Sequence, residues 1–424
     1  MSKRAHLSCL LIFGFMPAFV GWTTASPLEA NNKIGRIVVM ALDDSGKGWA
    51  WTDNAGLDLG AASSLVRIDN GSLHVVAVSS TSHTLLPDGL DMTRMAITAD
   101  GKEGWAIGSV GRDMDTNGSP MLWRLQNGSW GVAKNNFAKD TGLYNLTMIA
   151  DGSDGWMVTD EQGASNPSLL RLRNGDWYPA PEPDGAYVFR VASSPGGNQT
   201  WALGDGNPGT DIYHWTGWKW VLTYSNILPD RDPTQFAADD AGNAWLIGGS
   251  GGDEYLGEDK LIYFSDKAPP YQIALHRGSP EVYNGVALAL GGLTLSRRSG
   301  GWISGGYQNM DPESVSYPNP VLIHLQDSTA TLVEPQSAGI TLTGDSSLGE
   351  VAISPDGTYS WVESYDRQDF SGFIRLRDPA AAVQPTKPAA AGVGYWPGLL
   401  AVSLLALFAG IAVRKRSAAT RRRM

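Results

Sequence analysis

A tryptophan-centred repeat is the feature of this sequence that most constrains its fold. In residues 100–108, an Asp-Gly turn leads to a Gly-Trp pair followed by small and aliphatic residues. Residues 44–50 and 151–156 repeat this core, and four degenerate copies follow the same plan. Successive tryptophans are 44 to 59 residues apart, a period that indicates an array of similar structural units. The seven tryptophans are Trp49, Trp105, Trp156, Trp201, Trp245, Trp302 and Trp361.

A second pattern follows each tryptophan and divides the unit into strands. Alternating runs such as residues 121–125 and 169–172 come first, and Asn-Gly turns at 127–128 and 174–175 lead to another short run. Period-two alternation around an Asn-Gly turn is typical of β-hairpins. Each unit therefore has four expected strands, and seven such units predict an all-β, seven-bladed β-propeller over residues 26–378. The repeated tryptophans are expected to fill the core between blades.

Blade seven looks incomplete in sequence. Its third strand is expected to end near Arg377, and a Pro/Ala-rich linker, residues 379–394, follows. Residues 26–33 or the start of the linker could supply the missing outer strand, and the residues do not decide between them.

The N-terminal residues 1–25 have the layout of a secretory signal peptide. Lys3 and Arg4 precede an uncharged, mostly apolar run over residues 7–20, and small residues at 23–25 offer a cleavage site. The alternative, a buried N-terminal helix, fits this order of segments less well.

The C-terminal part predicts a membrane anchor. Residues 395–413 are apolar and long enough to cross a bilayer, with Tyr395 and Trp396 at one edge. Six basic residues lie in the tail, residues 414–424, which indicates a cytoplasmic C-terminus. A buried C-terminal helix would not explain this basic tail. We therefore expect a single-pass cell-membrane protein with its N-terminus outside.

Composition limits the possible partners of the expected ectodomain. The single cysteine, Cys9, lies in the predicted signal peptide, so the mature chain has no disulfide or thiolate metal site. Setting aside two basic residues in the signal and six in the tail leaves 24 Lys and Arg against 43 Asp and Glu, a net charge of −19. Such a charge argues against nucleic acid as a partner and allows bound cations.

The Gly-Trp-Ala-x-Gly and Asn-Gly-x-Trp patterns over residues 34–378 resemble secreted bacterial propeller repeats related to the sialidase-like (BNR) and photosystem II assembly-factor propellers. The resemblance implies the architecture, whereas the function varies among enzymes, scaffolds and receptors. Residues 354–361 differ from the sialidase Asp-box because Asp356 and Gly357 are adjacent. No sialidase residues are therefore carried over to this chain.

One loop of the expected blade two suggests a Ca²⁺ site. Asp113, Asp115 and Asn117, followed by a glycine, match the first half of a calcium-binding loop. The twelfth position, where such loops have a bidentate glutamate, is Arg124. An acidic turn without a metal is the alternative.

A candidate ligand site lies at the expected channel mouth. The position eleven residues before each repeat tryptophan should lie near the start of each innermost strand. Two arginines at this position could hold an anion, with Asn145 and Glu350 beside them, although channel-lining polar groups bonded to one another would show the same pattern. The seven residues are Val38, Arg94, Asn145, Arg190, Thr234, Gly291 and Glu350.

The sequence has no catalytic signature of the Gly-x-Ser-x-Gly, His-Glu-x-x-His or phosphate-loop type. We therefore expect a non-catalytic binding or assembly module for an extracellular glycan or protein ligand. The alternative is a glycan-active hydrolase or lyase that uses carboxylates of the loops between second and third strands, among them Asp160 and Asp205.

Overall fold

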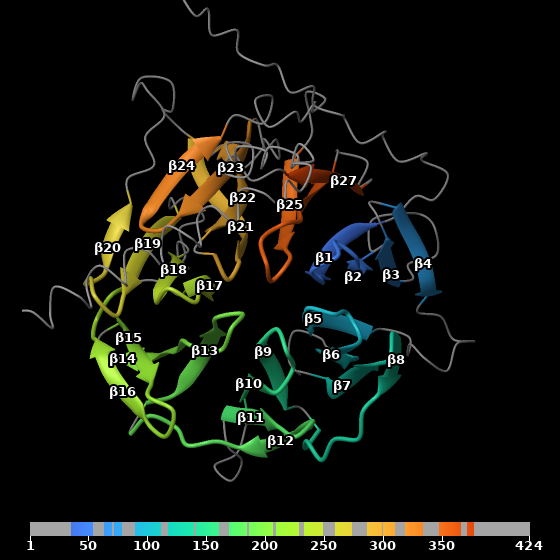
Figure 1. Cartoon of the computed structure of the whole chain (residues 1–424), viewed down its shortest axis with the longest axis horizontal. Coiled ribbons are helices and arrows are strands. Elements are labelled where there is room, and N and C mark those ends of the chain that lie inside the picture. Colours follow the sequence, from blue (N-terminus) through green and yellow to red (C-terminus); the bar gives the residue numbers. More distant parts are fainter. Residues whose placement is uncertain are drawn as a thin grey trace, which may run out of the picture. The chain divides into compact units, whose positions relative to one another are not determined.

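The computed structural model describes residues 35–53, 63–69, 72–78, 90–111, 118–139, 141–160, 169–184, 186–206, 209–228, 233–248, 259–273, 286–298, 300–309, 319–333, 347–365 and 371–376. All of them belong to one of two compact units, residues 1–377. They form seven antiparallel sheets around a central axis, with β1, β5, β9, β13, β17, β21 and β25 innermost (Figure 1).

The strands run outward through each blade in chain order. The first four blades contain β1 (Arg36–Leu42), β2 (Gly48–Asp53), β3 (Ser64–Asp69) and β4 (Ser72–Val78); β5 (Leu90–Ile97), β6 (Glu103–Val110), β7 (Ser119–Gln126) and β8 (Ser129–Val132); β9 (Gly142–Met148), β10 (Asp154–Asp160), β11 (Leu169–Arg173) and β12 (Asp176–Pro179); and β13 (Val188–Ser193), β14 (Thr200–Gly206), β15 (Gly209–Trp215) and β16 (Trp220–Tyr224).

The last three blades follow the same order. They contain β17 (Pro233–Ala238), β18 (Asn243–Gly248), β19 (Lys260–Ser265) and β20 (Tyr271–Ile273); β21 (Val286–Leu295), β22 (Gly300–Asn309), β23 (Asn319–Gln326) and β24 (Thr329–Val333); and β25 (Ser347–Ile353), β26 (Ser360–Tyr365) and β27 (Ser371–Leu376).

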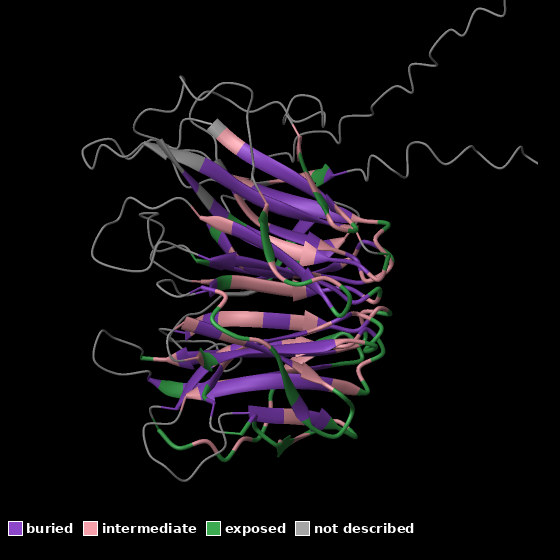
Figure 2. Cartoon of the chain, turned by 90° about the vertical axis from the view of Figure 1, so that its left-hand side faces the viewer, coloured by how far each residue is buried: buried purple, intermediate pink, exposed green. Residues whose placement is uncertain are grey.

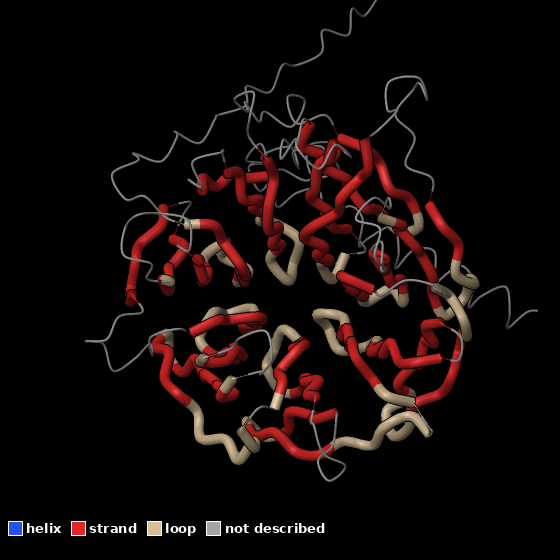
Figure 3. Tube along the Cα trace, turned by 180° about the vertical axis from the view of Figure 1, so that it is seen from behind, coloured by secondary structure: helices blue, strands red, loops and turns tan. Residues whose placement is uncertain are grey.

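This arrangement confirms the predicted all-β, seven-bladed propeller. Blade seven has three strands within the described residues, and both segments considered for its fourth strand lie outside them. The expected signal peptide, linker, membrane helix and tail also lie outside. Within the described ranges, no helix has the length and apolar character needed to span a membrane. Figure 3 shows only strands and loops in these ranges.

The repeat tryptophan lies on the second strand of every blade and is buried, as expected. Directly across on the third strand stands a cationic or aromatic residue that can cover the indole. The pairs are Trp49–Arg67, Trp105–Arg124, Trp156–Arg171, Trp201–His214, Trp245–Tyr263, Trp302–His324 and Trp361–Arg375.

Fourth-strand tryptophans join neighbouring blades. Trp130 of blade two meets Trp49 of blade one edge-on, with ring centroids 6.1 Å apart. Trp177 meets Trp105 at 5.7 Å in the same manner at the next junction. Edge-to-face contacts of this kind add to the stability from apolar burial. The two tryptophans of the repeat therefore meet between blades, and buried residues extend along the strands in Figure 2.

The turns between first and second strands lie on one face, called here the turn face, and join the blades there. The Asp44 N–H donates to the Ala99 carbonyl at 2.8 Å, and the Ala99 N–H donates to the Ala150 carbonyl at 2.7 Å. The ring is closed at this face by the Asp356 N–H, which donates to the Asp44 carboxylate at 2.8 Å. Among the described residues, bonds between these turns link six of the seven junctions.

Candidate functional site

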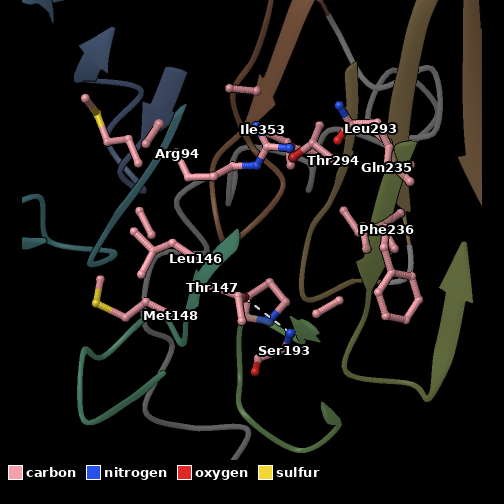
Figure 4. A pocket seen from close by; sticks show the side chains of 18 of the residues that line it. Arg94, Leu146, Thr147, Met148, Ser193, Gln235, Phe236, Leu293, Thr294 and Ile353 are labelled. Atoms are coloured by element: carbon pink, nitrogen blue, oxygen red, sulfur yellow. Dashed lines mark hydrogen bonds between the residues drawn. The ribbon is translucent and has the colours of Figure 1, made fainter. Parts of the chain in front are cut away.

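The seven innermost strands enclose a cavity of about 260 Å³ on the propeller axis. All seven contribute lining residues, so the cavity is the central channel. Figure 4 shows the Arg94 side chain extending into it from β5, with Gln235 and Thr294 on other strands. The channel is therefore the place where all seven blades can contribute to one site.

Each innermost strand has a register irregularity at the predicted position. In four strands the predicted residue is itself passed over in the pairing: Val38, Thr234, Gly291 and Glu350. In the other three, Arg94, Asn145 and Arg190 directly follow a residue that is passed over. A β-bulge interrupts the alternation of side chains and redirects them. The eleven-residue spacing thus marks a bulge that recurs around the channel.

The structure brings the four predicted ligand residues, Arg94, Asn145, Arg190 and Glu350, together as lining of this one cavity. Burial, with the nearby Arg94 guanidinium, lowers the pKa of Arg190 to about 10. Burial also raises the pKa of Glu350 to about 7, an effect that Glu363 strengthens and that Arg94 and Arg36 oppose. Two guanidinium groups and one carboxyl group that is hard to ionise therefore share the channel.

Asn145 has a structural task within this group. Its side-chain oxygen accepts a hydrogen bond from the Val191 N–H at 2.8 Å, which ties β9 to β13. Two residues along, the Thr147 hydroxyl accepts from the Ser193 N–H at 3.2 Å. These bonds hold blade four against blade three, and Figure 4 shows the one between Thr147 and Ser193. The side-chain oxygen of Asn145 therefore already accepts a hydrogen bond within the protein. The charged residues Arg94, Arg190 and Glu350 are the better candidates for contacting a ligand.

Sequence reasoning missed Glu363, which is fully buried beside the channel. Its carboxylate accepts from the Ile37 N–H at 2.6 Å and from the Glu350 N–H at 3.2 Å, so it links blade seven to blade one. Ser304 has the matching position in blade six and joins Gly292 to Gly349 of the next blade. The available signal was a polar residue two positions after the repeat tryptophan, where five blades have an apolar one.

The opposite face, called here the loop face, has a rim that carries some of the carboxylates expected on the loops between second and third strands. The Tyr144 hydroxyl donates to Asp160 at 3.2 Å. Burial raises the pKa of Tyr187 to about 12, helped by the charges of Asp160, Tyr144 and Asp205. Asp259 is committed elsewhere, since it accepts from the Leu290 N–H at 2.6 Å. Blades three and four therefore share a small cluster of tyrosines and aspartates at this rim.

The predicted calcium residues Asp113, Asp115 and Asn117 lie outside the described residues. Among the residues that are described, no group of three or more His, Cys, Asp or Glu side chains is arranged to hold a metal ion. The calcium loop therefore stays a prediction.

Comparisons with known proteins identify the architecture. No family model and no curated protein matches the chain. A solved structure described as YCF48 bound to D1 peptide is similar over 83% of this chain and 95% of that one, at 14% identity and a TM-score of 0.50. Hydrazine synthase from Kuenenia stuttgartiensis is similar over 85% and 99%, at 10% identity and a TM-score of 0.50. These likenesses show the propeller fold alone.

Proposed function

We propose that this protein is a membrane-anchored, cell-surface β-propeller that binds an anionic group of a protein ligand at its channel, without chemical turnover. The observation that carries the proposal is the excess of positive charge in the channel, because Arg94 and Arg190 line the same cavity as a single carboxyl group, Glu350. Both arginines are partly buried, where a guanidinium without a full counter-charge is unfavourable, and an incoming carboxylate relieves that cost.

The balance of charge also supports binding over catalysis. Among the described lining residues Glu350 is the one acidic side chain, because Glu363 lies behind it and accepts two backbone hydrogen bonds. Glycoside hydrolysis by paired carboxylates needs two such groups on opposite sides of a substrate. The channel lacks this pair among its described residues, and it offers two donors for a carboxylate instead.

A protein ligand is favoured over a glycan by one comparison. The similar structure described as YCF48 bound to D1 peptide is a propeller of this architecture that holds a peptide. The membrane anchor and outward orientation of the ectodomain belong to the same proposal and are supported by the apolar run and basic tail in the sequence.

Binding by the soluble ectodomain, residues 26–385, tests the proposal. A library of peptides with free or amidated C-termini and an array of neutral and acidic glycans would be screened for binding and for turnover. We expect a peptide with an exposed carboxylate to bind, and Arg94→Gln and Arg190→Gln to weaken it about tenfold, because each removes a charged hydrogen-bond donor. Arg173→Gln, at an exposed position on β11, is the matched control. Turnover of any substrate, or binding that both channel variants retain, contradicts the proposal.

A glycan-active enzyme at the loop-face rim is the second candidate. The charges of Asp160 and Asp205 both raise the pKa of the Tyr187 phenol, so two carboxylates act on one aromatic side chain of this rim. Release of reducing sugar from an acidic glycan, abolished by Asp160→Asn and unaffected by Arg94→Gln, would replace the binding proposal with this one.

A further inference from the structure

A groove of about 660 Å³ lies on the turn face between blades one and two, and Ile97 is the one lining residue that it shares with the channel. It is lined by cationic side chains, two aspartates, the buried Trp49 and an Asn-Gly turn. The lining residues on which the argument rests are Lys47, Arg67, Asp43, Asp100, Asn127 and Gly128.

In most other blades, the two positions that hold Lys47 and Arg67 in blade one carry side chains that contact each other. In five blades, the residue two before the repeat tryptophan contacts the residue facing that tryptophan on the third strand. The contacts join Glu103 to Arg124, Asp154 to Arg171, Gln199 to His214, Asn243 to Tyr263 and Tyr359 to Arg375. In blade one the same two positions hold Lys47 and Arg67, which are both cations.

Arg67 consequently has no carboxylate partner among the described residues. Its guanidinium lies over the Trp49 ring at 5.9 Å, farther than Arg124 and Arg171 lie from theirs at 5.2 and 5.0 Å. Lys47 forms an ion pair with Asp69 at 3.1 Å, and both of these side chains are partly exposed.

The space beside Arg67 at the junction of blades one and two is open, whereas the equivalent space between blades two and three is filled. Between blades two and three, the Arg124 guanidinium donates to the Gly175 carbonyl at 3.2 Å. A β-carbon added at Gly175 would come within 2.8 Å of that guanidinium. A β-carbon added at Gly128, the matching turn residue of the first junction, would meet nothing within 4 Å. The groove thus occupies the space that an arginine fills one blade later.

We propose that this groove binds an acidic monosaccharide, with its carboxylate between Arg67 and Lys47 and its hydroxyl groups toward Asn127 and Asp100. A guanidinium and an ammonium group on one side suit a single carboxylate. The polar lining suits hydroxyl groups, and the volume is in the range of small-molecule sites. This site does not depend on the function proposed for the channel.

The remaining charges limit the ligand to a small monoanion. Asp43 is committed to its own turn, where it accepts from the Ser45 and Lys47 N–H groups at 2.8 and 3.0 Å. Asp100 forms an ion pair with Lys102 at 2.9 Å. The chain as a whole carries a net charge of −11, which repels polyanions such as nucleic acids.

Equilibrium binding to the ectodomain tests the site, with glucuronate as the ligand and acetate, glucose and sulfate in parallel. We expect glucuronate to bind more tightly than acetate or sulfate, and glucose not to bind. Lys47→Glu replaces the ion pair with Asp69 by the kind of pair found in blades two and three, so it should weaken glucuronate binding about tenfold or more with little change in thermal stability. Arg67→Gln should weaken binding similarly, and Arg173→Gln should leave it unchanged.

Three outcomes would overturn the proposal. Wild-type protein that does not bind glucuronate excludes the site. Binding retained in both Lys47→Glu and Arg67→Gln places the ligand elsewhere. If acetate or sulfate binds as tightly as glucuronate, the groove binds an anion and does not recognise the sugar. Because Arg67 is exposed and Lys47→Glu completes a pair that the fold already uses, loss of binding through misfolding would be recognised by a lowered melting temperature.

Discussion

Glu363 shows how one buried side chain closes a ring of blades. Its two carboxylate oxygens accept from the N–H groups of Ile37 and Glu350, which belong to the first and last blades. We expect Glu363→Ala to lower the free energy of unfolding by about 3 kcal/mol, because it leaves two buried donors without a partner. Glu363→Gln should cost about 1–2 kcal/mol, since its amide group can accept at only one oxygen. Urea denaturation measures both changes. Equal stability of the wild type and the two variants would show that the hydrogen bonds of Glu363 contribute little to stability.

The raised pKa of the Glu350 carboxyl group should make the stability of the protein depend on pH. Burial raises its pKa from the ordinary value of 4.5 to about 7 in the folded protein. Its contribution to stability is therefore fully present below pH 4.5 and is lost as the pH rises toward 7, because the folded state holds the proton more tightly. Glu350→Gln cannot lose a proton, so its stability should fall less than that of wild type between pH 4.5 and 7. Denaturation midpoints across this range measure the difference, and parallel curves for the two proteins would contradict the assignment.

Within a pair of strands, the residue that faces the repeat tryptophan should contribute differently to stability in different blades. Arg171 forms an ion pair with Asp154 and lies over Trp156 and Trp215, at 5.0 and 5.2 Å. Arg171→Leu should therefore destabilise the protein by about 2 kcal/mol. Arg67→Leu, at the matching position of blade one, should change stability by less than about 0.5 kcal/mol, because that arginine has no such pair. Thermal melts of the two variants compare them directly, and equal losses would contradict the difference between the blades.

The predicted calcium loop belongs to the connection between β6 and β7. If Asp113, Asp115 and Asn117 bind Ca²⁺, the ion should stabilise the folded state by about 2.7 kcal/mol at a hundredfold excess over Kd. The melting temperature should then rise in millimolar calcium, and Asp115→Ala should abolish the rise. Identical melting in calcium and in chelator, for wild type and variant, would reduce the motif to an acidic turn.

At the scale of the whole molecule, the proposed topology separates a propeller from its anchor. The described strands end at Leu376, so removal of residues 388–424 leaves all of them intact. We expect this truncation to release a folded ectodomain into the medium, whereas the full chain stays with membranes. Cell fractionation followed by thermal melting of the released protein tests both points. A truncated protein that still pellets with membranes would show that the C-terminal segment is not the anchor.

Local patterns in the amino-acid sequence predict the number of blades, the order of the strands and the positions of the tryptophans. Alternation along a strand and the Asn-Gly and Asp-Gly turns are local signals, and seven copies of the repeat strengthen each of them. The eleven-residue spacing also picks out one position on every innermost strand, among them Arg94 and Glu350, and the structure shows a bulge at this position.

The contacts that those residues make depend on the folded arrangement of the blades. The bond between Glu363 and Ile37 joins positions 326 residues apart, and no local pattern encodes such a partner. The sequence predicts Asn145 as a ligand residue, whereas in the structure its side-chain oxygen accepts a hydrogen bond from the Val191 N–H. The open groove at Arg67 likewise depends on space that is free beside Gly128 and filled by Arg124 beside Gly175. Repeated local signals specify a blade, whereas the contacts that close the ring and shape its sites depend on how blades meet, because residues distant in sequence come together only after folding.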